Sequence, residues 1–246
     1  MRVEVLFTPA EVDELSMRSK NVVIIDVLRA SSTICTALTN GAKEIIPTPD
    51  VESATKIASN LSPDSHLLGG ERQGKRIDGF HLGNSPLEYS AEKVAGKTIV
   101  FTTTNGTGAI YKCRYASVAI IGSFLNLSAV VQVMRETGNE WTILCAGQQA
   151  NFSIEDAACA GMILSKLNTS QLAETDDAGL TCMILYKNFK GNILRMMKKS
   201  SHGQYLISIG MKEDLKYCSE VDKLSVIPVI DGVSIRVKSN KTINNG

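Results

Sequence analysis

Short apolar runs rich in β-branched residues recur through the first three-fifths of the chain and alternate with segments of helical pattern. Runs of this length and composition are typical of β-strands. Several are almost continuously apolar, as expected when helices cover both faces of a sheet. The strands predicted in this way are Val3–Phe7, Val22–Ile25, Glu44–Ile46, His66–Leu68, Thr98–Phe101, Val118–Ile121 and Trp141–Leu144.

The segments between these strands predict helices. One of them ends at Gly41, a residue type common just after a helix, and Asp50 stands where it would cap the next one. Alternating strands and helices predict an α/β fold with a substantially parallel sheet. The predicted helices are Ser31–Asn40, Val51–Asn60, Asn105–Lys112, Leu127–Glu136 and Ser153–Leu167.

The last third of the chain has a different pattern. Asp176–Phe189 and Asp214–Val221 are helical in pattern. Val226–Ile230 and Val233–Val237 are strand-like and flank an Asp-Gly pair, which is a strong hairpin turn signal. We therefore expect a C-terminal antiparallel hairpin and a mixed sheet.

Length and composition narrow the class of protein. The chain has 246 residues, of which 43% are hydrophobic and 21% are charged, as in ordinary soluble globular proteins. We expect one domain over residues 1–246, and two lobes with a break near residues 168–175 remain an alternative. The formal net charge is +1 and there is one Trp, so neither nucleic acid nor a membrane surface is an expected partner.

The N-terminus and the cysteines indicate a cytoplasmic protein. The chain begins with a strand-like run instead of a signal segment, and no stretch approaches the roughly 20 apolar residues of a spanning helix. The six cysteines form no CxxC motif and most lie in apolar runs, so we expect buried thiols in a reducing compartment.

A long polar connection, Gly69–Pro86, is the first candidate for chemistry. It contains five glycines, both signs of charge and the two apolar side chains of Ile77 and Phe80. Connections of this length are usually functional or disordered, and the mixed composition argues against disorder. The connection ends on Ser85-Pro86-Leu87-Glu88, which has the sequence of a helix capping box.

Polar residues also follow three further predicted strands. Asp26, Arg29, Ser31 and Ser32 follow the second strand. The run of Thr102 to Asn105, followed by Gly106, comes after the fifth, and Glu155 and Asp156 stand in the first turn of the helix after the seventh. In open α/β sheets ligands bind at the carboxyl ends of the strands, so these groups are expected to meet at one edge.

The chemistry of these groups suits an anionic ligand and Mg²⁺. Magnesium ions join one or two protein carboxylates to the phosphate of a substrate. Arg29, Arg72 and Arg76 suit phosphate or sulfonate, because a guanidinium group binds two oxygens at once. Structural interpretations remain open, with Asp26 or Ser153 as helix caps, Thr102–Asn105 as a turn and His66 and His81 as structural histidines.

Motifs of the common phosphate-handling enzymes are absent. The chain has no GxxxxGK[ST] loop, no GxSxG elbow and no HExxH. The Asp26-Val27-Leu28 segment lacks the second Asp of the DxDxT phosphatases, and Cys35 has no Arg six residues later. Physical reasoning alone therefore predicts Mg²⁺-assisted chemistry on a small, multiply anionic substrate, without choosing the reaction.

At these residues the chain resembles the 2-phosphosulfolactate phosphatase family of coenzyme M biosynthesis. The matching segments are IDVLRASSTI (25–34), GGERQGKRIDGFHLGNSPLEY (69–89), TTTNGT (102–107) and SIEDAACAG (153–161), with SHGQYLISIG, Asp214 and IPVIDG as a weaker C-terminal part. The GER and DGF.LGNSP element is the most specific, and the order and spacing cover nearly the whole chain.

The resemblance implies a Mg²⁺-dependent phosphatase that hydrolyses (R)-2-phospho-3-sulfolactate to 3-sulfolactate and phosphate. It also implies a three-layer α/β/α fold. The alternatives are a phosphatase for another small phosphorylated hydroxy acid and a non-catalytic protein that binds an anionic metabolite. A homo-oligomer is also left open.

The expected roles follow from this resemblance and from the chemistry of each side chain. Asp26 either joins the metal ligands or attacks phosphorus. Arg29 and Arg72 stabilise the transition state, and His81 or a protonated carboxyl donates a proton. The catalytic candidates are Asp26, Arg29, Glu71, Arg72 and His81. The metal-binding candidates are Asp26, Glu71, Glu155 and Asp156. The substrate-binding candidates are Ser31, Ser32, Arg76, Asp78, Asn84, Ser85, Thr103, Thr104, Asn105 and Gly106.

Overall fold

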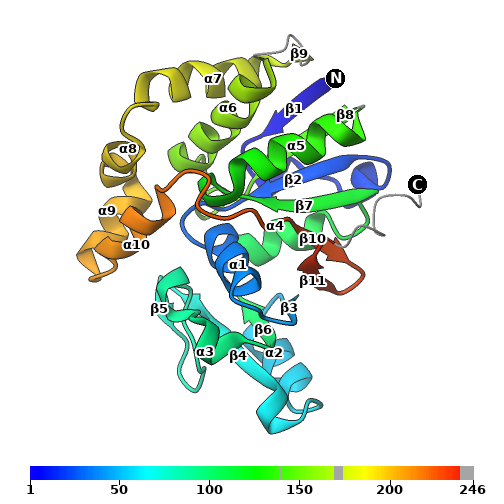
Figure 1. The fold of residues 1–246 in the computed structure, drawn as a ribbon, viewed down its shortest axis with the longest axis vertical. Helices are drawn as coiled ribbons and strands as arrows, with labels where there is room; N and C mark the ends of the chain where they lie inside the picture. The colour runs from blue at the N-terminus through cyan, green and yellow to red at the C-terminus, as the bar shows by residue number, and fades with distance from the viewer. Residues whose placement is uncertain (139, 169–173, 239–246) are drawn as a thin grey trace.

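The computed structural model describes residues 1–138, 140–168 and 174–238. It is an α/β protein in which every predicted strand is present (Figure 1). The seven strands expected before residue 146 are β1 (Arg2–Leu6), β2 (Asn21–Ile25), β3 (Glu44–Pro47), β4 (His66–Arg72), β6 (Thr98–Thr102), β7 (Val118–Gly122) and β8 (Glu140–Cys145). The C-terminal hairpin is β10 (Pro228–Asp231) and β11 (Ser234–Val237), and two short strands are β5 (Lys75–Arg76) and β9 (Glu174–Thr175).

The hairpin of β10 and β11 lies in the middle of the sheet. The strand order is β5-β4-β6-β3-β11-β10-β7-β2-β8-β1-β9. The strands on each side of the hairpin pair in parallel, apart from β5, which pairs antiparallel to β4, and the hairpin pairs antiparallel to both sets. The expectation of a mixed, largely parallel sheet with a C-terminal hairpin is confirmed, and the hairpin joins two parallel sets that run in opposite directions.

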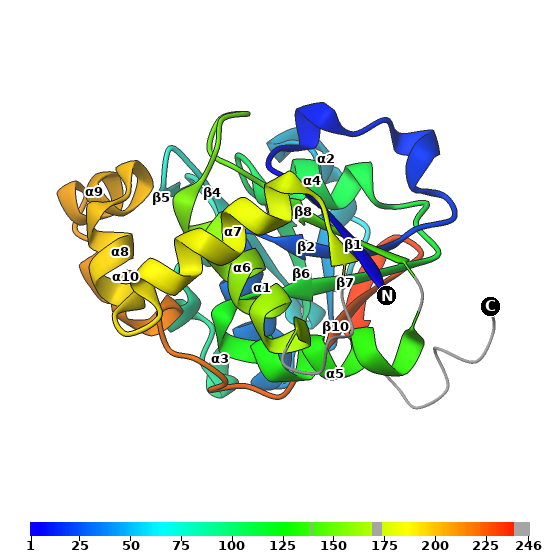
Figure 2. The ribbon, with the colours of Figure 1, turned by 90° about the horizontal axis from the view of Figure 1, so that it is seen from above.

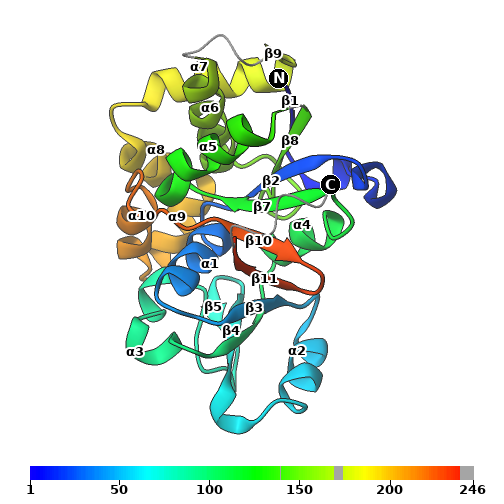
Figure 3. The same ribbon diagram turned by 45° about the vertical axis from the view of Figure 1, so that its right-hand side comes forward.

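The twist of the sheet explains how strands from both parallel sets end close to each other. Five steps separate β2 from β6 in the strand order. Neighbouring strands are rotated by roughly 20–25°, so about 100° of rotation accumulates over these steps. Figure 3 shows the two sets crossing at a large angle. Because of this rotation, the carboxyl ends of β2 and β6 approach each other although the two strands belong to oppositely directed sets.

Helices cover both faces of the sheet, which confirms the expected three layers. In Figure 2 the strands lie between α5 and α4. Alternate residues of β2 face opposite cores: Val23 and Ile25 pack with α5 and α6, whereas Val22 and Ile24 pack with α4. The expected helices are α1 (Ala30–Thr39), α2 (Val51–Ala58), α4 (Gly106–Lys112), α5 (Leu127–Thr137), α6 (Ile154–Asn168), α7 (Asp177–Phe189) and α10 (Lys212–Cys218).

Three further helices were not predicted from the sequence. They are α3 (Ala91–Val94), α8 (Ile193–Lys199) and α9 (Ser201–Ser208). Ser200 marks the boundary of the last two, because its side chain accepts a hydrogen bond from the Gly203 amide and caps α9. The predicted caps at Asp50 and the glycine after the first helix, Gly41, are both present.

The connection from Gly69 to Pro86 is partly regular structure. Strand β4 continues to Arg72 and turns back into β5. Phe80 is buried against α2 and β6, so it anchors the connection. The capping-box prediction at Ser85 is wrong: residues Pro86–Glu88 form one 3₁₀ turn, and Ser85 makes no capping hydrogen bond.

The helices and the sheet also bear on the expectations about membrane spans and domains. Within the described ranges, no helix combines the length and apolar character needed to cross a bilayer. All eleven strands belong to one sheet. Most of the break considered near residues 168–175 lies outside the described residues, so the single domain stays a prediction.

Candidate active site

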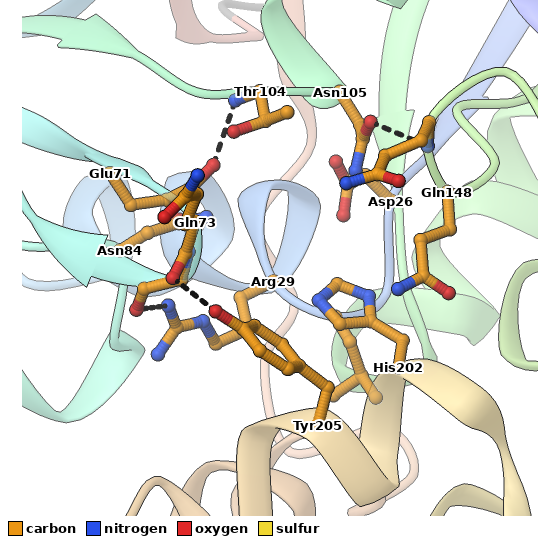
Figure 4. A pocket seen from close by; sticks show the side chains of 13 residues that line it. Asp26, Arg29, Glu71, Gln73, Asn84, Thr104, Asn105, Gln148, His202 and Tyr205 are labelled. Atoms are coloured by element: carbon orange, nitrogen blue, oxygen red, sulfur yellow. Dashed lines mark hydrogen bonds between the residues drawn. The ribbon is translucent and has the colours of Figure 1, made fainter. Parts of the chain in front are cut away.

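A polar cavity of about 500 Å³ lies where the predicted strand ends meet. It receives residues from the ends of β2, β4, β6 and β8 and from helix α9 (Figure 4). The strand-end clustering inferred from the sequence is therefore present in the fold. The residues that line it are Asp26, Leu28, Arg29, Glu71, Gln73, Gly74, Asn84, Thr104, Asn105, Gln148, Gln149, His202 and Tyr205.

Asp26 stands at the end of β2 and is buried at the start of α1. Its Oδ1 accepts a hydrogen bond from the Ala30 amide at 3.3 Å, and its own amide donates to Ser31 Oγ at 2.8 Å. Burial raises the pKa of Asp26 from 3.8 to about 6, although the nearby charge of His202 acts in the opposite direction. Asp26 thus accepts a hydrogen bond from the first amide of α1 and is also a cavity carboxyl with a raised affinity for protons.

Glu71 ties two loops of the cavity together. Its Oε2 accepts a hydrogen bond from the Gly74 amide, and its Oε1 accepts one from the Thr104 amide, both at 2.7 Å. Gly74 has a φ of +70°, a conformation that strongly favours glycine. The buried carboxylate therefore fixes the turn after β4 against the loop after β6.

Arg29 is held rigidly at the wall of the cavity. Its Nη1 donates to Asp214 Oδ2 and its Nη2 donates to the Gly74 carbonyl, both at 2.6 Å. The side chains of Arg29 and Asp214 are 2% and 3% exposed. The guanidinium is therefore positioned by the turn after β4 and by α10, and the negative charge of Asp214 balances it.

The loop after β6 and the start of α4 form another wall. Asn105 Oδ1 accepts a hydrogen bond from the Gln149 amide at 3.0 Å and so connects this loop to the one after β8. A Cβ atom at Gly106 would lie 2.7 Å from Asp26 Oδ2 and 2.5 Å from Ala30 Cβ. Only a glycine at this position lets α4 approach Asp26 so closely.

Asn84 contributes a buried acceptor that the protein does not use. Its side chain lines the cavity, and Oδ1 has no hydrogen-bond partner among the described residues. Leaving a buried polar atom unpaired costs about 1–3 kcal/mol, so such atoms in a cavity mark a place for a ligand, an ion or water.

Helix α9 supplies two residues that the sequence-based prediction missed. His202 and Tyr205 are three residues apart, so they share one helix face, and in Figure 4 both point from α9 into the cavity. Tyr205 donates its hydroxyl proton to the Gln73 carbonyl at 2.7 Å. In the sequence, the available signal was the three-residue spacing of this His and Tyr within the SHGQYLISIG segment, which belongs to the weaker C-terminal part of the family resemblance.

Four predicted residues of the long connection do not line the cavity. Arg72 bonds to the Glu71 carbonyl and the Thr102 hydroxyl. Arg76 and Asp78 are exposed. The ring of His81 accepts a hydrogen bond from the Leu68 amide at 3.0 Å, on the exposed side of β4. Their assignment to catalysis or substrate binding is therefore not supported by their positions.

Four predicted hydroxyl residues are buried but bond within the protein. Ser31 and Ser32 satisfy backbone groups at the end of β2. Ser85 donates to Asp214 at 2.6 Å, and Thr103 accepts a hydrogen bond from the Thr107 amide. These side chains shape the loops around the cavity without being among its lining residues.

The predicted set of four metal-binding carboxylates is not one cluster. Among the described residues, no group of three or more His, Cys, Asp and Glu side chains could hold a metal ion. Asp156 is not among the residues that line the central cavity, and its two oxygens accept hydrogen bonds from the Val27 and Gly147 amides. Glu155 lines an adjoining cavity of about 510 Å³ and faces His202. Of the four, Asp26 and Glu71 line the central cavity.

Comparison with known proteins decides the family. Residues 6–232 match the family model described as 2-phosphosulpholactate phosphatase. The chain belongs to the 2-phosphosulfolactate phosphatase family. The resemblance recognised in the sequence is confirmed, and with it the expectation of a phosphoric monoester hydrolase by family.

Curated members of the 2-phosphosulfolactate phosphatase family resemble the chain over nearly their whole length. A probable 2-phosphosulfolactate phosphatase of Caldanaerobacter subterraneus is 43% identical over 229 residues, which are 93% of this chain and 95% of that protein. Proteins with the same description from Symbiobacterium thermophilum and Clostridium beijerinckii are 43% and 39% identical, over 84% and 93% of this chain and 89% and 96% of their own.

Proposed function

We propose that this chain is a phosphatase that hydrolyses (R)-2-phospho-3-sulfolactate to 3-sulfolactate and inorganic phosphate with the help of Mg²⁺. The observation that carries the proposal is the convergence of family-matched segments on one cavity, where Asp26, Glu71 and Thr104 come from three different strand ends. The relatives are described by that substrate.

The cavity offers groups suited to a substrate with several anionic oxygens. Arg29 lines the cavity and stands just before the N-terminus of α1, where the helix dipole also favours negative charge. Thr104 and Asn105 add hydroxyl and amide groups that bind oxygen. Arg29 is held by Asp214 before any substrate arrives, so positioning it costs little conformational entropy.

The donor set of the cavity fits a magnesium ion that is shared with the substrate. Magnesium uses oxygen ligands and is usually bound by one or two carboxylates together with substrate phosphate. Asp26 and Glu71 are the carboxylates that would hold it, and the unpaired Oδ1 of Asn84 is a further oxygen donor. When bound, Mg²⁺ supplies positive charge that neutralises the phosphoryl oxygens.

The residues of the chain bind and orient the ester. Arg29 stabilises charge on the equatorial oxygens of the phosphoryl group as the ester bond breaks. Glu71 holds the Thr104 amide and the turn after β4 in fixed positions around that group. Asp26 is placed either to help hold the metal or to attack phosphorus itself, and both roles require its carboxylate.

Phosphate release tests the proposal. The panel contains 2-phospho-3-sulfolactate, 2-phospholactate and 2-phosphoglycerate, each with Mg²⁺ and with EDTA. We expect the sulfonated substrate to have the highest kcat/KM and EDTA to abolish turnover. Asp26→Asn should lower kcat by at least about 10²-fold, whereas Asp64→Asn, an exposed carboxylate outside the cavity, should not.

Each other result identifies a different fault in the proposal. A preference for a substrate without sulfonate would make the chain a phosphatase for another hydroxy acid. Full activity in EDTA would exclude Mg²⁺ from the proposed reaction. Tight binding of one compound without any phosphate release would indicate a binding protein. A cytoplasmic location and a homo-oligomeric state stay predictions.

A further inference from the structure

His202, which is half-buried, and the buried Glu155 form an imidazole–carboxylate pair beside the cavity. His202 Nδ1 lies 3.6 Å from Glu155 Oε1, and the two side chains are 16% and 2% exposed. Glu155 Oε1 has no hydrogen-bond partner among the described residues. A buried carboxylate oxygen without a donor is costly, so the imidazole is the group in position to compensate it when its Nδ1 carries a proton.

The orientation of this pair leaves one ring nitrogen of His202 available to a ligand in the cavity. With Nδ1 directed at Glu155, Nε2 is the nitrogen that remains for a ligand, since the hydrogen bond of one ring nitrogen sets the role of the other. His202 lines both the central cavity and the adjoining one that Glu155 lines. Figure 4 shows its imidazole pointing from α9 toward Asp26.

We propose that His202 is the catalytic residue that protonates the leaving oxygen of the phosphate ester, and that Glu155 is the positioning residue that orients its ring. The proposal rests on the phosphatase function proposed above. It replaces His81, which lies outside the cavity lining. The chain contains three histidines, and of these His202 is the one that lines the cavity.

The proton balance of the reaction is complete with these groups and water. The bond between phosphorus and the ester oxygen breaks, and its electron pair stays on the ester oxygen. The Nε2 proton of the imidazolium moves to that oxygen and gives the free hydroxy acid. Water supplies the oxygen that becomes bonded to phosphorus, and the proton that this water releases returns to His202.

Leaving-group dependence provides the sharpest test. An alkoxide is a poor leaving group that needs a proton, whereas p-nitrophenolate leaves without one. His202→Asn should lower kcat about 10²- to 10⁴-fold on 2-phospho-3-sulfolactate, with a much smaller change in KM. On p-nitrophenyl phosphate the loss should be less than about tenfold. The control His66→Asn changes a histidine outside the cavity and should keep wild-type values.

Glu155→Gln tests the positioning role. It keeps the size of the buried side chain and removes its charge, so we expect a fall in kcat of about tenfold or more on the alkyl ester and little change on the aryl ester. A purely structural loss would affect both substrates equally. In the His202→Ala variant, added imidazole should restore part of the activity on the alkyl ester.

Several outcomes contradict the inference. Wild-type activity in His202→Asn would overturn it and leave the phosphatase function intact, as would an equal loss on both substrates together with no imidazole rescue in folded His202→Ala protein. Release of no phosphate from any compound by the wild-type protein would contradict the phosphatase function itself, and the role of His202 with it.

Discussion

Arg29 and Asp214, 185 residues apart in the sequence, form an ion pair of 2.6 Å in the interior of the protein. The second oxygen of Asp214 accepts a hydrogen bond from Ser85 at 2.6 Å, and Arg29 also donates to the Gly74 carbonyl. Both charges therefore have additional partners. The pair connects the loop after β2, the connection after β4 and helix α10 around one wall of the cavity.

Asp214→Asn should destabilise the protein strongly. The substitution keeps the shape of the side chain but leaves the Arg29 guanidinium buried without its counter-charge, which costs about 3–5 kcal/mol. We expect a lower urea midpoint and a loss of kcat/KM, because the guanidinium is no longer held in place. Urea unfolding followed by circular dichroism measures the first effect, and phosphate release measures the second.

Ser85→Ala is the matched control for this pair. It removes one hydrogen bond to Asp214 and keeps both charges, so its cost should be about 1 kcal/mol. We expect the charge balance between Arg29 and Asp214 to contribute more to stability than the surrounding hydrogen bonds. Equal stability losses in the two variants would contradict this.

Gly106→Ala should disturb the cavity through a steric effect. The new Cβ would lie 2.5 Å from Ala30 Cβ and 2.7 Å from Asp26 Oδ2, so α4 or Asp26 must move. We expect a loss of about 1–3 kcal/mol in stability and of about 10²-fold in kcat/KM. Gly108→Ala in the same helix has open space around its Cβ and should be neutral or stabilising. Similar kinetics in both variants would argue against the close approach of Gly106 to Asp26.

Asp26→Asn should become more stabilising as the pH rises. Burial raises the folded-state pKa of Asp26 to about 6 from 3.8, so the folded protein binds this proton more tightly than the unfolded chain. The wild-type protein therefore loses stability between about pH 4 and pH 6, and the variant does not. We expect the variant to gain about 3 kcal/mol relative to wild type over this range, measured by urea unfolding in EDTA. A difference that is constant with pH would show that Asp26 titrates normally.

Asp222 caps helix α5 from a distant part of the chain. Its carboxylate accepts hydrogen bonds from the amide and hydroxyl of Ser128, and pairs with Lys166 at 2.9 Å. Burial alone would raise the pKa of Asp222, but these partners outweigh it and lower the pKa. The resulting stabilisation is present above the usual carboxyl pKa and disappears as the pH falls through the lowered one.

Asp222→Ala should cost about 1–2 kcal/mol at pH 7, because the cap is lost. Asp222→Asn keeps a side-chain acceptor and tolerates the left-handed backbone at this position, where φ is +56°, so it should cost less. Thermal unfolding at pH 7 and pH 3 checks both effects. A penalty for Asp222→Ala that is unchanged at pH 3 would mean that backbone strain, and not the carboxylate, accounts for it.

Local patterns were sufficient for the main strands of the sheet, for most of the helices and for much of the candidate site. Strands such as Val22–Ile25 are short, apolar and bounded by polar residues, and most were placed within a residue or two, whereas β4 extends four residues beyond the predicted Leu68. Asp26, Glu71 and Thr104 were found because each lies at or just after the carboxyl end of a strand, and parallel strands bring such positions together.

The capping-box prediction was wrong because the side chain concerned bonds to a distant partner. Ser85 has the local sequence of a helix cap, but its hydroxyl bonds to Asp214 on α10. His81 and Arg76 stand in the same connection as Glu71, but both are exposed and neither lines the cavity. Proximity in sequence says little about direction, because successive residues of a strand point to opposite faces.

By itself the sequence determined the α/β class, the strands and helices of the sheet layers, and the family. These depend on periodicity, on turn and cap residues and on motifs, all of which act over a few neighbouring residues. Only the tertiary structure decided that the hairpin of β10 and β11 lies inside the sheet, that Arg29 pairs with Asp214, and that His202 joins Asp26 at the cavity. These relationships depend on sheet twist and on the packing of α9 and α10, which no local pattern encodes.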